Sequence, residues 1–479
     1  MLLQDVIPAA AGTSAGAVDI TALAYDNRKV EPGTLFFCVP GFTRDGHDFA
    51  PEAVERGAAA LVVQRRLGLG VPEVLVDDVR AAMAPAAAAL HGDPTAALDV
   101  VGITGTNGKT TTAFLIRALL EAAGRQTGLL GTVQQVVGGV ATDAVRTTPE
   151  AIDLQATFAA MRDGGDRACV MEVSSHALEL RRADAIHWDV AVFTNLTQDH
   201  LDFHPTMEDY FAAKRRLFEA APGVSVINVD DPYGRRLAEG LPRAVTYGIE
   251  APSAALRAED VRFDLQGSSF RLGGTEFSVP LPGRFNVLNA LAAIASARAL
   301  GIGDATIAAA LAEAARAPGR FEPIDEGQPF AVLVDYAHTP DSLDNVLRAA
   351  RALTGGRVLS VFGCGGDRDR GKRPQMGEIS ARLADHTVVT SDNPRSEDPQ
   401  AIVDEIMAGI VDRGEVEAIV DRREAIAAAV AQARPGDVVV IAGKGHEQGQ
   451  EFAGGEKLPF DDATVARDAL RALAGTTSS

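Results

Sequence analysis

The chain has 479 residues, which at roughly 150 residues per domain predicts about three domains. Hydrophobic residues make up 46% of the chain and charged residues 23%, a balance that excludes a wholly disordered protein. Forty-five lysines and arginines against 65 aspartates and glutamates give a net charge of −20. A field of this sign repels phosphate backbones, so no nucleic-acid partner is expected, although a local basic pocket for a small anion is compatible with it.

The three cysteines, Cys38, Cys169 and Cys364, form no CxxC motif. This argues against a disulfide framework or a zinc knuckle and favours a reducing compartment. The N-terminus has no basic stretch followed by an apolar one, so no signal peptide is expected. No uncharged apolar run reaches about 18 residues, so no membrane insertion is expected. We therefore predict a cytoplasmic protein of several domains.

Strand-like and helical segments alternate along much of the chain. The first 97 residues mix short apolar runs with alanine-rich helical stretches and end in the turn-rich HGDPTAA. The alternation that follows is typical of βαβ units around a parallel sheet. Its strands are expected at 100–104, 168–175, 189–196 and 224–230, and its helices at 111–124 and 207–221. Short alternating segments with glycine turns at 254–282 predict antiparallel hairpins, and an alanine-rich helix is expected at 286–301.

The alternation resumes after APGRFEP, near residue 320. Five further strands are expected, at 331–336, 357–363, 386–392, 416–420 and 437–443. This pattern predicts a second doubly wound α/β unit. We expect an α/β protein of three domains: an N-terminal domain at 1–97, a central P-loop ATPase-type parallel sheet at 98–320, and a C-terminal Rossmann-like doubly wound sheet at 321–479.

A glycine-rich loop follows the strand predicted at 100–104 and precedes a predicted helix, which is the context of a phosphate-binding loop. It consists of Gly105, Thr106, Asn107, Gly108, Lys109, Thr110 and Thr111. Glycines let backbone N–H groups close around phosphate oxygens, and the helix N-terminus adds a positive dipole. Lys109 would reach the β- and γ-phosphates, and the Thr110 hydroxyl would ligate Mg²⁺. The alternative is a glycine turn with a solvated lysine, because the strict motif has glycine where this chain has Ile103. The loop alone does not choose between a GTPase, a motor ATPase and a ligase.

Three further residues are candidates for the chemistry near this loop. Glu172 ends a predicted strand, at the edge where ligands bind in open α/β sheets, so it can hold Mg²⁺; a solvent-facing carboxylate is the alternative. His200 follows the next strand. Its i, i+4 spacing to His204 lacks an HExxH motif, so no zinc site is expected. Lys214, beside two arginines, taken alone is typical of a helix surface.

Nine segments in order resemble the Mur ligase family of peptidoglycan synthesis. They are GTNGKTT, MEVSSHAL, TNLTQDHLDFH, YFAAKRRLF, PGRFNVLNALAA, DYAHTPDSL, FGCGGDRDRGKRP, SDNPRSEDP and AGKGHE. The resemblance covers nearly the whole chain, is most specific in its central and C-terminal parts, and assigns the three domains to a UDP-substrate, ATP and an amino acid. It implies an ATP-dependent amide ligase acting on UDP-N-acetylmuramoyl-L-alanyl-D-glutamate. The substrate carboxylate would take the γ-phosphoryl group of ATP to form an acyl phosphate, and the amino acid would then displace phosphate.

The resemblance also assigns residues to ATP and magnesium. The residues that match the magnesium region are Thr110, Glu172, His200 and Lys214, and Lys214 matches a lysine that the family carbamylates to an anion (N6-carboxylysine). Lys109, Lys214 and His200 are the catalytic candidates. Asn289, Arg320 and Asp335 match nucleotide contacts, with His338 as a further candidate whose alternative is a structural role in its loop. Because these contacts come from different domains, hinge motion is expected.

A second group matches contacts to the UDP-sugar dipeptide. Its members are Tyr25, Asn27, Thr147, Thr148, Ser174 and Arg182. The chain departs from the family at three positions: Asn27 replaces the usual serine, Arg146 stands where asparagine is common, and Leu180 where glutamine is common. Hydroxyls, amides and arginines still suit a pyrophosphate and a carboxylate. Residues 41–49 resemble the uridine-side loop of the family, with an ordinary turn as the alternative.

The motif Asp392-Asn393-Pro394-Arg395 bears on which amino acid is added. In the family this motif accompanies meso-diaminopimelate, whose second carboxylate is absent from lysine. Arg395 can contact that carboxylate with two prongs, while Asp392 and Asn393 address the ammonium. The remaining matches are Arg368, Gly443 and Glu447. The alternatives are an Asx-Pro turn for the motif and, for the function, a lysine-adding ligase, a folylpolyglutamate synthase or a nucleotide switch that ligates nothing. A monomer is expected.

Overall fold

A computed structural model of the chain describes residues 1–41, 43–220, 222–411 and 414–477. Phe42, in the predicted uridine-side loop, and Ala221, at the end of a predicted helix, lie outside the described residues. The chain divides into two compact units: Met1–Thr104, Ala123–Val192 and Ala213–Ser225 form the first, and Gly105–Ala122, Phe193–Ala212 and Val226–Ser479 form the second. The domain boundaries predicted after residues 97 and 320 stay a prediction. No described helix is long and apolar enough to cross a membrane.

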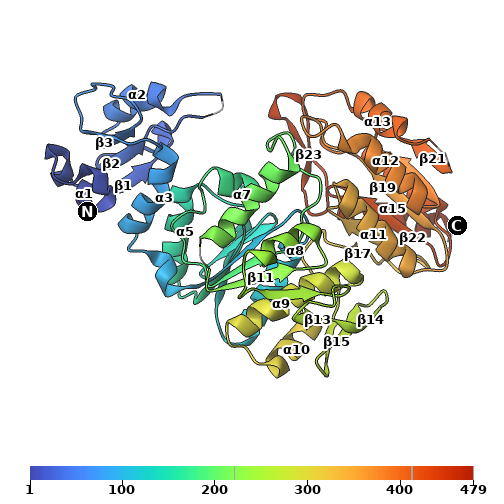
Figure 1. Cartoon of the computed structure of the whole chain (residues 1–479). Coiled ribbons are helices and arrows are strands. Elements are labelled where there is room, and N and C mark those ends of the chain that lie inside the picture. The colour runs from blue at the N-terminus through green and yellow to red at the C-terminus, as the bar shows by residue number, and fades with distance from the viewer. Residues whose placement is uncertain (42, 221, 412–413, 478–479) are drawn as a thin grey trace. The chain divides into compact units, whose positions relative to one another are not determined.

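The first unit begins with a parallel sheet in the order β1-β2-β3-β4 (Figure 1). The strands are Ala22–Ala24, Thr34–Phe37, Ala58–Val63 and Glu73–Leu75, and the helices are α1 (Leu3–Val6), α2 (Ala50–Glu55) and α3 (Val79–Leu90). Successive side chains of a strand point to opposite faces of its sheet. Leu35 and Phe37 therefore pack in one apolar cluster with α1 and α3, while Phe36 packs in another with α2.

The same unit contains strands in the order β10-β5-β9-β6-β7-β8. Their bounds are β5 Asp99–Thr104, β6 Thr127–Leu130, β7 Gln134–Val137, β8 Val140–Asp143, β9 Ala168–Glu172 and β10 Val190–Phe193. Strands β5, β9 and β6 are parallel, and β7 and β8 are antiparallel additions. Ile103 of β5 is paired with Glu172 of β9, so the carboxyl ends of these two buried strands lie side by side. Helices α5 (Ala151–Asp163), α6 (Ser175–Glu179) and α7 (Met207–Glu219) follow these strands in the chain.

The second unit contains the helix that follows the glycine-rich loop, α4 (Lys109–Ala122), packed against α9 (Arg284–Ala299) and α10 (Asp304–Ala312). Parallel strands β11 (Val224–Asn228), β12 (Val245–Gly248) and β13 (Leu256–Arg257) are neighbours, with α8 (Pro232–Glu239) between the first two in the chain. The predicted hairpins are confirmed as the antiparallel sheet β14 (Glu259–Phe263), β15 (Ser268–Leu272) and β16 (Thr275–Val279).

The C-terminal part of the second unit is a sheet in the order β17-β18-β22-β19-β20-β21. Its strands are Glu322–Pro323, Ala331–Asp335, Val438–Ala442, Val358–Phe362, His386–Val389 and Glu415–Ala418, in that order. The helices are α11 (Pro340–Ala352), α12 (Lys372–Leu383), α13 (Pro399–Ala408), α14 (Arg422–Gln432) and α15 (Asp462–Thr477). The hairpin of β23 (Gly449–Glu451) and β24 (Lys457–Pro459) lies between β22 and α15 in the chain.

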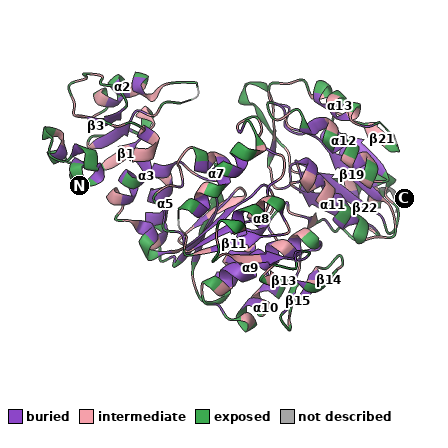
Figure 2. Cartoon of the chain, in the orientation of Figure 1, coloured by how far each residue is buried: buried purple, intermediate pink, exposed green. Residues whose placement is uncertain are grey.

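Helices cover both faces of this C-terminal sheet. Val438 and Val440 of β22 pack with α11, α12 and α13, whereas Val439 and Ile441 pack with α14 and α15. All strands except β17 are parallel, and the central ones are buried on both faces, as Figure 2 shows in purple. Such strands are continuous apolar runs, which is why the sequence reveals them. The predicted Rossmann-like doubly wound sheet is confirmed.

Candidate active site

The glycine-rich loop lies directly between β5 and α4, as predicted. Gly105 and Gly108 have φ values of 149° and 85°, which side chains rarely adopt. A Cβ at Gly108 would lie 2.4 Å from Oδ1 of Asn289 in α9, so the absence of a side chain there lets α9 approach the loop. The Lys109 ammonium donates to the carbonyls of Gly105 and Thr106, at 3.0 and 2.8 Å. This lysine therefore bends over its own loop, where a phosphate would lie.

The TNLT segment after β10 supports the loop through several hydrogen bonds. The Thr194 hydroxyl donates to the Asn107 carbonyl at 2.7 Å, and the Asn107 N–H donates to Oδ1 of Asn195 at 2.8 Å. The Thr106 hydroxyl donates to the Thr197 carbonyl at 3.2 Å. A loop fixed in this way keeps its backbone N–H groups oriented before any anion binds, which lowers the entropic cost of binding.

The predicted nucleotide residues Asn289, Arg320 and Asp335 lie around the same loop or its neighbours. Nη2 of Arg320 donates to the Thr110 hydroxyl at 3.1 Å, and its guanidinium lies 4.3 Å from the centre of the Tyr336 ring. Asp335 is buried and accepts from the Phe321 N–H at 2.7 Å. Burial raises the pKa of Asp335 from 3.8 to about 6. The structure therefore brings Arg320 onto the phosphate loop, while Asp335 accepts from the backbone of the next residue, Phe321.

His200 and His338 share a carboxylate that the sequence interpretation did not single out. Oδ2 of Asp199 lies 3.4 Å from Nε2 of His200 and 3.9 Å from Nε2 of His338. Burial opposes ionisation of Asp199, yet these two imidazoles help to hold its pKa well below its usual range. Burial lowers the pKa of His338, whose Nδ1 donates to the Tyr336 carbonyl at 2.8 Å. The only sequence signal for Asp199 is its place in TNLTQDH.

Glu172 and Lys214 lie in the first unit, and both are 1% exposed. The interpretation of Lys214 as an ordinary surface lysine is therefore wrong. Glu172 accepts from the Thr132 N–H at 2.8 Å and from the Thr132 hydroxyl at 3.1 Å. A Cβ at Gly131 would lie 2.6 Å from Oε1 of Glu172. The alternative of a solvent-facing Glu172 is excluded. In the described residues, no group of three or more His, Cys, Asp or Glu side chains is arranged to hold a metal.

The predicted UDP-substrate residues all lie in the first unit, where several have protein partners. The Thr148 hydroxyl donates to the Glu172 carbonyl at 2.9 Å, and the Thr147 hydroxyl lies 3.1 Å from that of Thr132. The Ser174 hydroxyl caps α6 by accepting from the Ala177 N–H. These bonds connect the residues before α5 to the carboxyl end of β9.

Charged residues surround the same region. The Glu150 carboxylate lies 2.8 Å from Arg182, 3.2 Å from Arg146 and 3.4 Å from Arg80, so three cations share one anion. This leaves positive charge for a further anion. The Tyr25 hydroxyl donates to Asp153 at 2.5 Å, and burial raises the pKa of this phenol. Asn27 donates to Glu52 at 2.7 Å on the surface.

The loops after β20 and β22 bring the predicted diaminopimelate residues together. Nδ2 of Asn393 donates to Oε2 of Glu447 at 2.8 Å, and a Cβ at Gly443 would lie 2.5 Å from Oδ2 of Asp392. A Cβ at Gly365 would lie 3.0 Å from Nη1 of Arg395 and 3.9 Å from Cγ of Arg368. The loops at the carboxyl ends of these parallel strands thus lie together. Cys364 is buried beside this loop, and burial raises its pKa to about 12, which fits packing rather than thiolate chemistry.

Lys444 is a second residue that the sequence interpretation missed. Its side chain is fully buried, and its ammonium donates to Oδ1 of Asn393 at 2.8 Å and to Oε2 of Glu447 at 3.0 Å. It also lies 3.9 Å from Asp392. Its position inside AGKGHE was the available signal. One buried cation thus joins three of the predicted amino-acid contacts.

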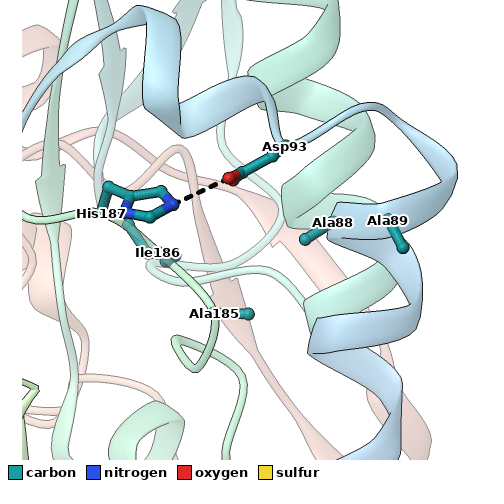
Figure 3. A pocket seen from close by; sticks show the side chains of 6 residues that line it. All are labelled: Ala88, Ala89, Asp93, Ala185, Ile186 and His187. Carbon is teal, nitrogen blue, oxygen red and sulfur yellow. Dashed lines mark hydrogen bonds and ion pairs between the residues drawn. The ribbon is translucent and has the colours of Figure 1, made fainter. Parts of the chain in front are cut away.

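A pocket of about 330 Å³ lies elsewhere in the first unit (Figure 3). It is lined by Ala88, Ala89, Asp93, Ala185, Ile186 and His187. Nε2 of His187 lies 2.8 Å from Oδ2 of Asp93, and both side chains are largely exposed. None of the predicted site residues lines this pocket.

Comparison with known proteins matches most of the chain to one family. Residues 103–297 match the Mur ligase middle domain, residues 319–445 the Mur ligase glutamate ligase domain, and residues 19–91 the catalytic domain of the Mur ligase family. A UDP-N-acetylmuramoyl-L-alanyl-D-glutamate–2,6-diaminopimelate ligase of Geobacillus kaustophilus is 50% identical over 473 residues, covering 95% of this chain and 96% of its own. The Streptomyces coelicolor protein of the same name is 48% identical over 478 residues, covering 96% and 94%.

Solved structures agree with these matches. A structure named as a UDP-N-acetylmuramoyl-L-alanyl-D-glutamate–2,6-diaminopimelate ligase is 34% identical, covers 99% of both chains and has a TM-score of 0.72. A Mycobacterium tuberculosis folylpolyglutamate synthase covers 83% of this chain and 95% of its own, with a TM-score of 0.60, and at 21% identity shares the fold alone.

The phosphate loop follows a buried strand and precedes a helix, and Arg320 donates to the hydroxyl of Thr110 in this loop. Together with the matches above, this site defines an ATP-dependent ligase. The predicted three-domain α/β fold is that of solved relatives. The chain belongs to the Mur ligase family.

Proposed function

We propose that the chain adds meso-diaminopimelate to UDP-N-acetylmuramoyl-L-alanyl-D-glutamate, with ATP, through an acyl phosphate. Relatives that are about half identical over nearly the whole chain carry the name of this ligase. The observation that carries the choice of amino acid is the convergence of the loops after β20 and β22, where Asn393 bonds Glu447 and Asp392 lies against Gly443. Such a cluster holds an amino-acid head group by charge and hydrogen bonds.

ATP binds with its phosphates on the loop from Gly105 to Thr111. Lys109 exchanges its two carbonyl partners for phosphate oxygens and neutralises charge as the γ-phosphoryl group moves to the substrate carboxylate. Arg320 already reaches Thr110 and so approaches the same phosphates. Asn289 abuts the loop at Gly108. Positioning and charge supply most of the catalysis, because phosphoryl transfer asks for little covalent work from the protein.

The family implies Mg²⁺, and the proposed residues include oxygen donors of the kind that this ion prefers. Mg²⁺ prefers oxygen ligands, and Glu172 supplies a buried carboxylate while Thr110 supplies a hydroxyl. Lys214 is buried as well, and a carbamate on its side chain would supply a further anionic oxygen ligand. When bound, the metal neutralises phosphate charge. His200, whose Nε2 lies 3.4 Å from Oδ2 of Asp199, is the remaining residue that the family resemblance assigns to the magnesium region.

The UDP-sugar dipeptide and the amino acid bind to two separate groups of residues in the proposed reaction. Three arginines around the one carboxylate of Glu150 leave an excess of positive charge, and Arg182 among them binds an anionic group of the UDP-substrate. The other residues proposed for this substrate are Tyr25, Asn27, Thr147, Thr148 and Ser174. Arg395 and Arg368 bind the distal carboxylate of meso-diaminopimelate, whose ammonium meets Asp392 and Asn393 next to Pro394. Glu447, bonded to Asn393, and Gly443, which lies against Asp392, are the remaining contacts to the amino acid.

We further propose a cytoplasmic monomer. ATP and a nucleotide-linked sugar are intracellular substrates, and all three cysteines are buried and free, as a reducing compartment allows. Light scattering on the purified chain measures the oligomeric state, and a mass of twice 50.1 kDa would overturn the monomer.

The test is phosphate release from ATP with UDP-N-acetylmuramoyl-L-alanyl-D-glutamate, adding meso-diaminopimelate or L-lysine in parallel. We expect turnover with meso-diaminopimelate and little with lysine, because lysine has no distal carboxylate to accept from Arg395. Turnover with lysine instead would keep the ligase and discard the interpretation of Arg395. Phosphate release that depends on neither amino acid would point to a nucleotide switch.

A further inference from the structure

Two residues of strand β23 form hydrogen bonds with the loop that carries Arg395. Nε2 of Gln450 donates to the Asp392 carbonyl at 2.9 Å, and the Glu451 N–H donates to Oδ1 of Asn393 at 3.0 Å. The Arg395 N–H in turn donates to the Glu451 carbonyl at 2.9 Å. Two consecutive residues of β23 thus bond three residues of the Asp-Asn-Pro-Arg motif.

The backbone at Arg395 is strained, and the bond from β23 helps to hold it. Its φ is 51°, in the left-handed region that is unfavourable for a residue other than glycine. A residue in this conformation persists only when its surroundings fix it. Arg395 makes an isolated β-bridge with Phe452, the residue that follows Glu451, which ties this backbone to the hairpin.

The guanidinium of Arg395 is fixed from two sides. Nε donates to Oε2 of Glu451 at 2.9 Å, and Nη1 donates to the Gly366 carbonyl at 2.7 Å. Within the described part of the chain, Nη2 has no hydrogen-bond partner. The side chains of Arg395 and Glu451 are 21% and 43% exposed, so the group is accessible but not freely solvated. The two bonds therefore fix the orientation of the guanidinium and with it the position of the open Nη2 group.

We propose that Glu451 is a positioning residue for amino-acid selectivity. Its carboxylate holds the Nε edge of Arg395 so that the Nη2 edge stays open for the distal carboxylate of the incoming amino acid. This inference rests on the proposed function, because it takes Arg395 as the contact to that carboxylate. Glu451 itself does not touch the reacting atoms.

The test compares three variants of the full-length chain by steady-state kinetics in all three substrates. Glu451→Gln keeps a hydrogen-bond acceptor and loses the charge, Glu451→Ala loses both, and Glu456→Gln makes the same charge change at an exposed position of the same hairpin. We expect KM for meso-diaminopimelate to rise about threefold in Glu451→Gln and about tenfold in Glu451→Ala, as for a partly exposed charge-assisted bond. KM for ATP and kcat should stay unchanged, and Glu456→Gln should match the parent.

A second readout separates positioning from general damage to the fold. The preference for meso-diaminopimelate over L-lysine, as a ratio of kcat/KM values, should fall by the same factor, since lysine offers Arg395 no carboxylate. An unchanged KM in Glu451→Ala, equal rises in KM for ATP and amino acid, or a lower KM for meso-diaminopimelate would each overturn the inference. If the parent chain itself shows no dependence on meso-diaminopimelate, the proposed function fails and takes this inference with it.

Discussion

The ion pair of Arg422 and Asp462 lies behind the amino-acid loops and can be tested directly. Both side chains are 0% exposed, and they pair twice, from Nε to Oδ1 and from Nη2 to Oδ2, each at 2.7 Å. Arg422 also donates to the carbonyls of Ser391 and Ala442, at 3.3 and 2.9 Å. These residues directly precede Asp392 and Gly443. The perturbation is Asp462→Ala.

The expected loss of stability depends on the hydrogen bonds that Arg422 keeps in Asp462→Ala. Removing one partner of a buried pair leaves an uncompensated charge and costs about 3–5 kcal/mol. Because the two carbonyls still accept from Arg422, we expect the lower end, about 3 kcal/mol. The double variant Arg422→Met/Asp462→Leu removes both charges and should lose about 1 kcal/mol or less. The double variant should therefore be more stable than Asp462→Ala alone, so the effects of the two substitutions on the free energy of unfolding should not add.

Hydrogen exchange measures this locally. A loss of about 3 kcal/mol predicts amides of β22 that exchange about 100-fold faster in Asp462→Ala, since 1.36 kcal/mol is a factor of ten. The one tryptophan, Trp188, lies in the first unit, so its fluorescence serves as a control that should not change. Unchanged exchange in Asp462→Ala, or losses that simply add in the double variant, would refute the reasoning.

Three further substitutions follow from the site. Lys109→Ala should lower ADP formation about a thousandfold, since it removes the cation over the loop, and activity within tenfold of the parent would contradict its role. Arg395→Ala should raise KM for meso-diaminopimelate about 30-fold with KM for ATP unchanged, and an equal rise in both would contradict the specificity argument. Asp335 has a folded pKa raised from 3.8 to about 6, so its stabilising contribution is present below pH 3.8 and is lost as pH rises through 6. Urea titration should therefore show that the free energy of unfolding of the parent falls by about 2 kcal/mol relative to that of Asp335→Asn between pH 4 and 7. Parallel pH profiles of the two proteins would contradict the shift.

Sequence reasoning succeeds where one physical rule controls local structure. Strands such as β22 are buried on both faces, so they read as unbroken apolar runs, and loops at their carboxyl ends meet at one edge. That rule is enough to predict, from the amino-acid sequence alone, that the loops of Asp392 and Gly443 lie together. The glycine-rich loop was equally local, because strand, glycines, lysine and helix follow one another in the chain.

The same reasoning fails where a contact depends on tertiary packing. Lys214, beside two arginines on a helix, has the pattern of a surface residue, yet the side of α7 it occupies is buried. Glu451 belongs to no motif, and only the pairing of β23 with the loop of Arg395 gives it a role. Lys444 lay inside a recognised motif, but its full burial required the structure.

The nucleotide and amino-acid residues of the second unit are joined by a backbone contact that only glycines permit. A Cβ at Gly319, where φ is 65°, would lie 2.1 Å from the His446 nitrogen. Arg320, next to Gly319, reaches the phosphate loop, and Glu447, next to His446, bonds Asn393. The Tyr336 ring lies between, 4.3 Å from the Arg320 guanidinium and 5.2 Å from the His446 ring. The approach is equally close from the other side, since a Cβ at Gly445 would lie 2.6 Å from the Gly319 carbonyl oxygen. A side chain at either glycine would force the two backbones apart and open a gap between packed atoms, which costs contact energy. The two glycines therefore keep Arg320 and Glu447 in one packed part of the second unit, although the two residues are far apart in the sequence.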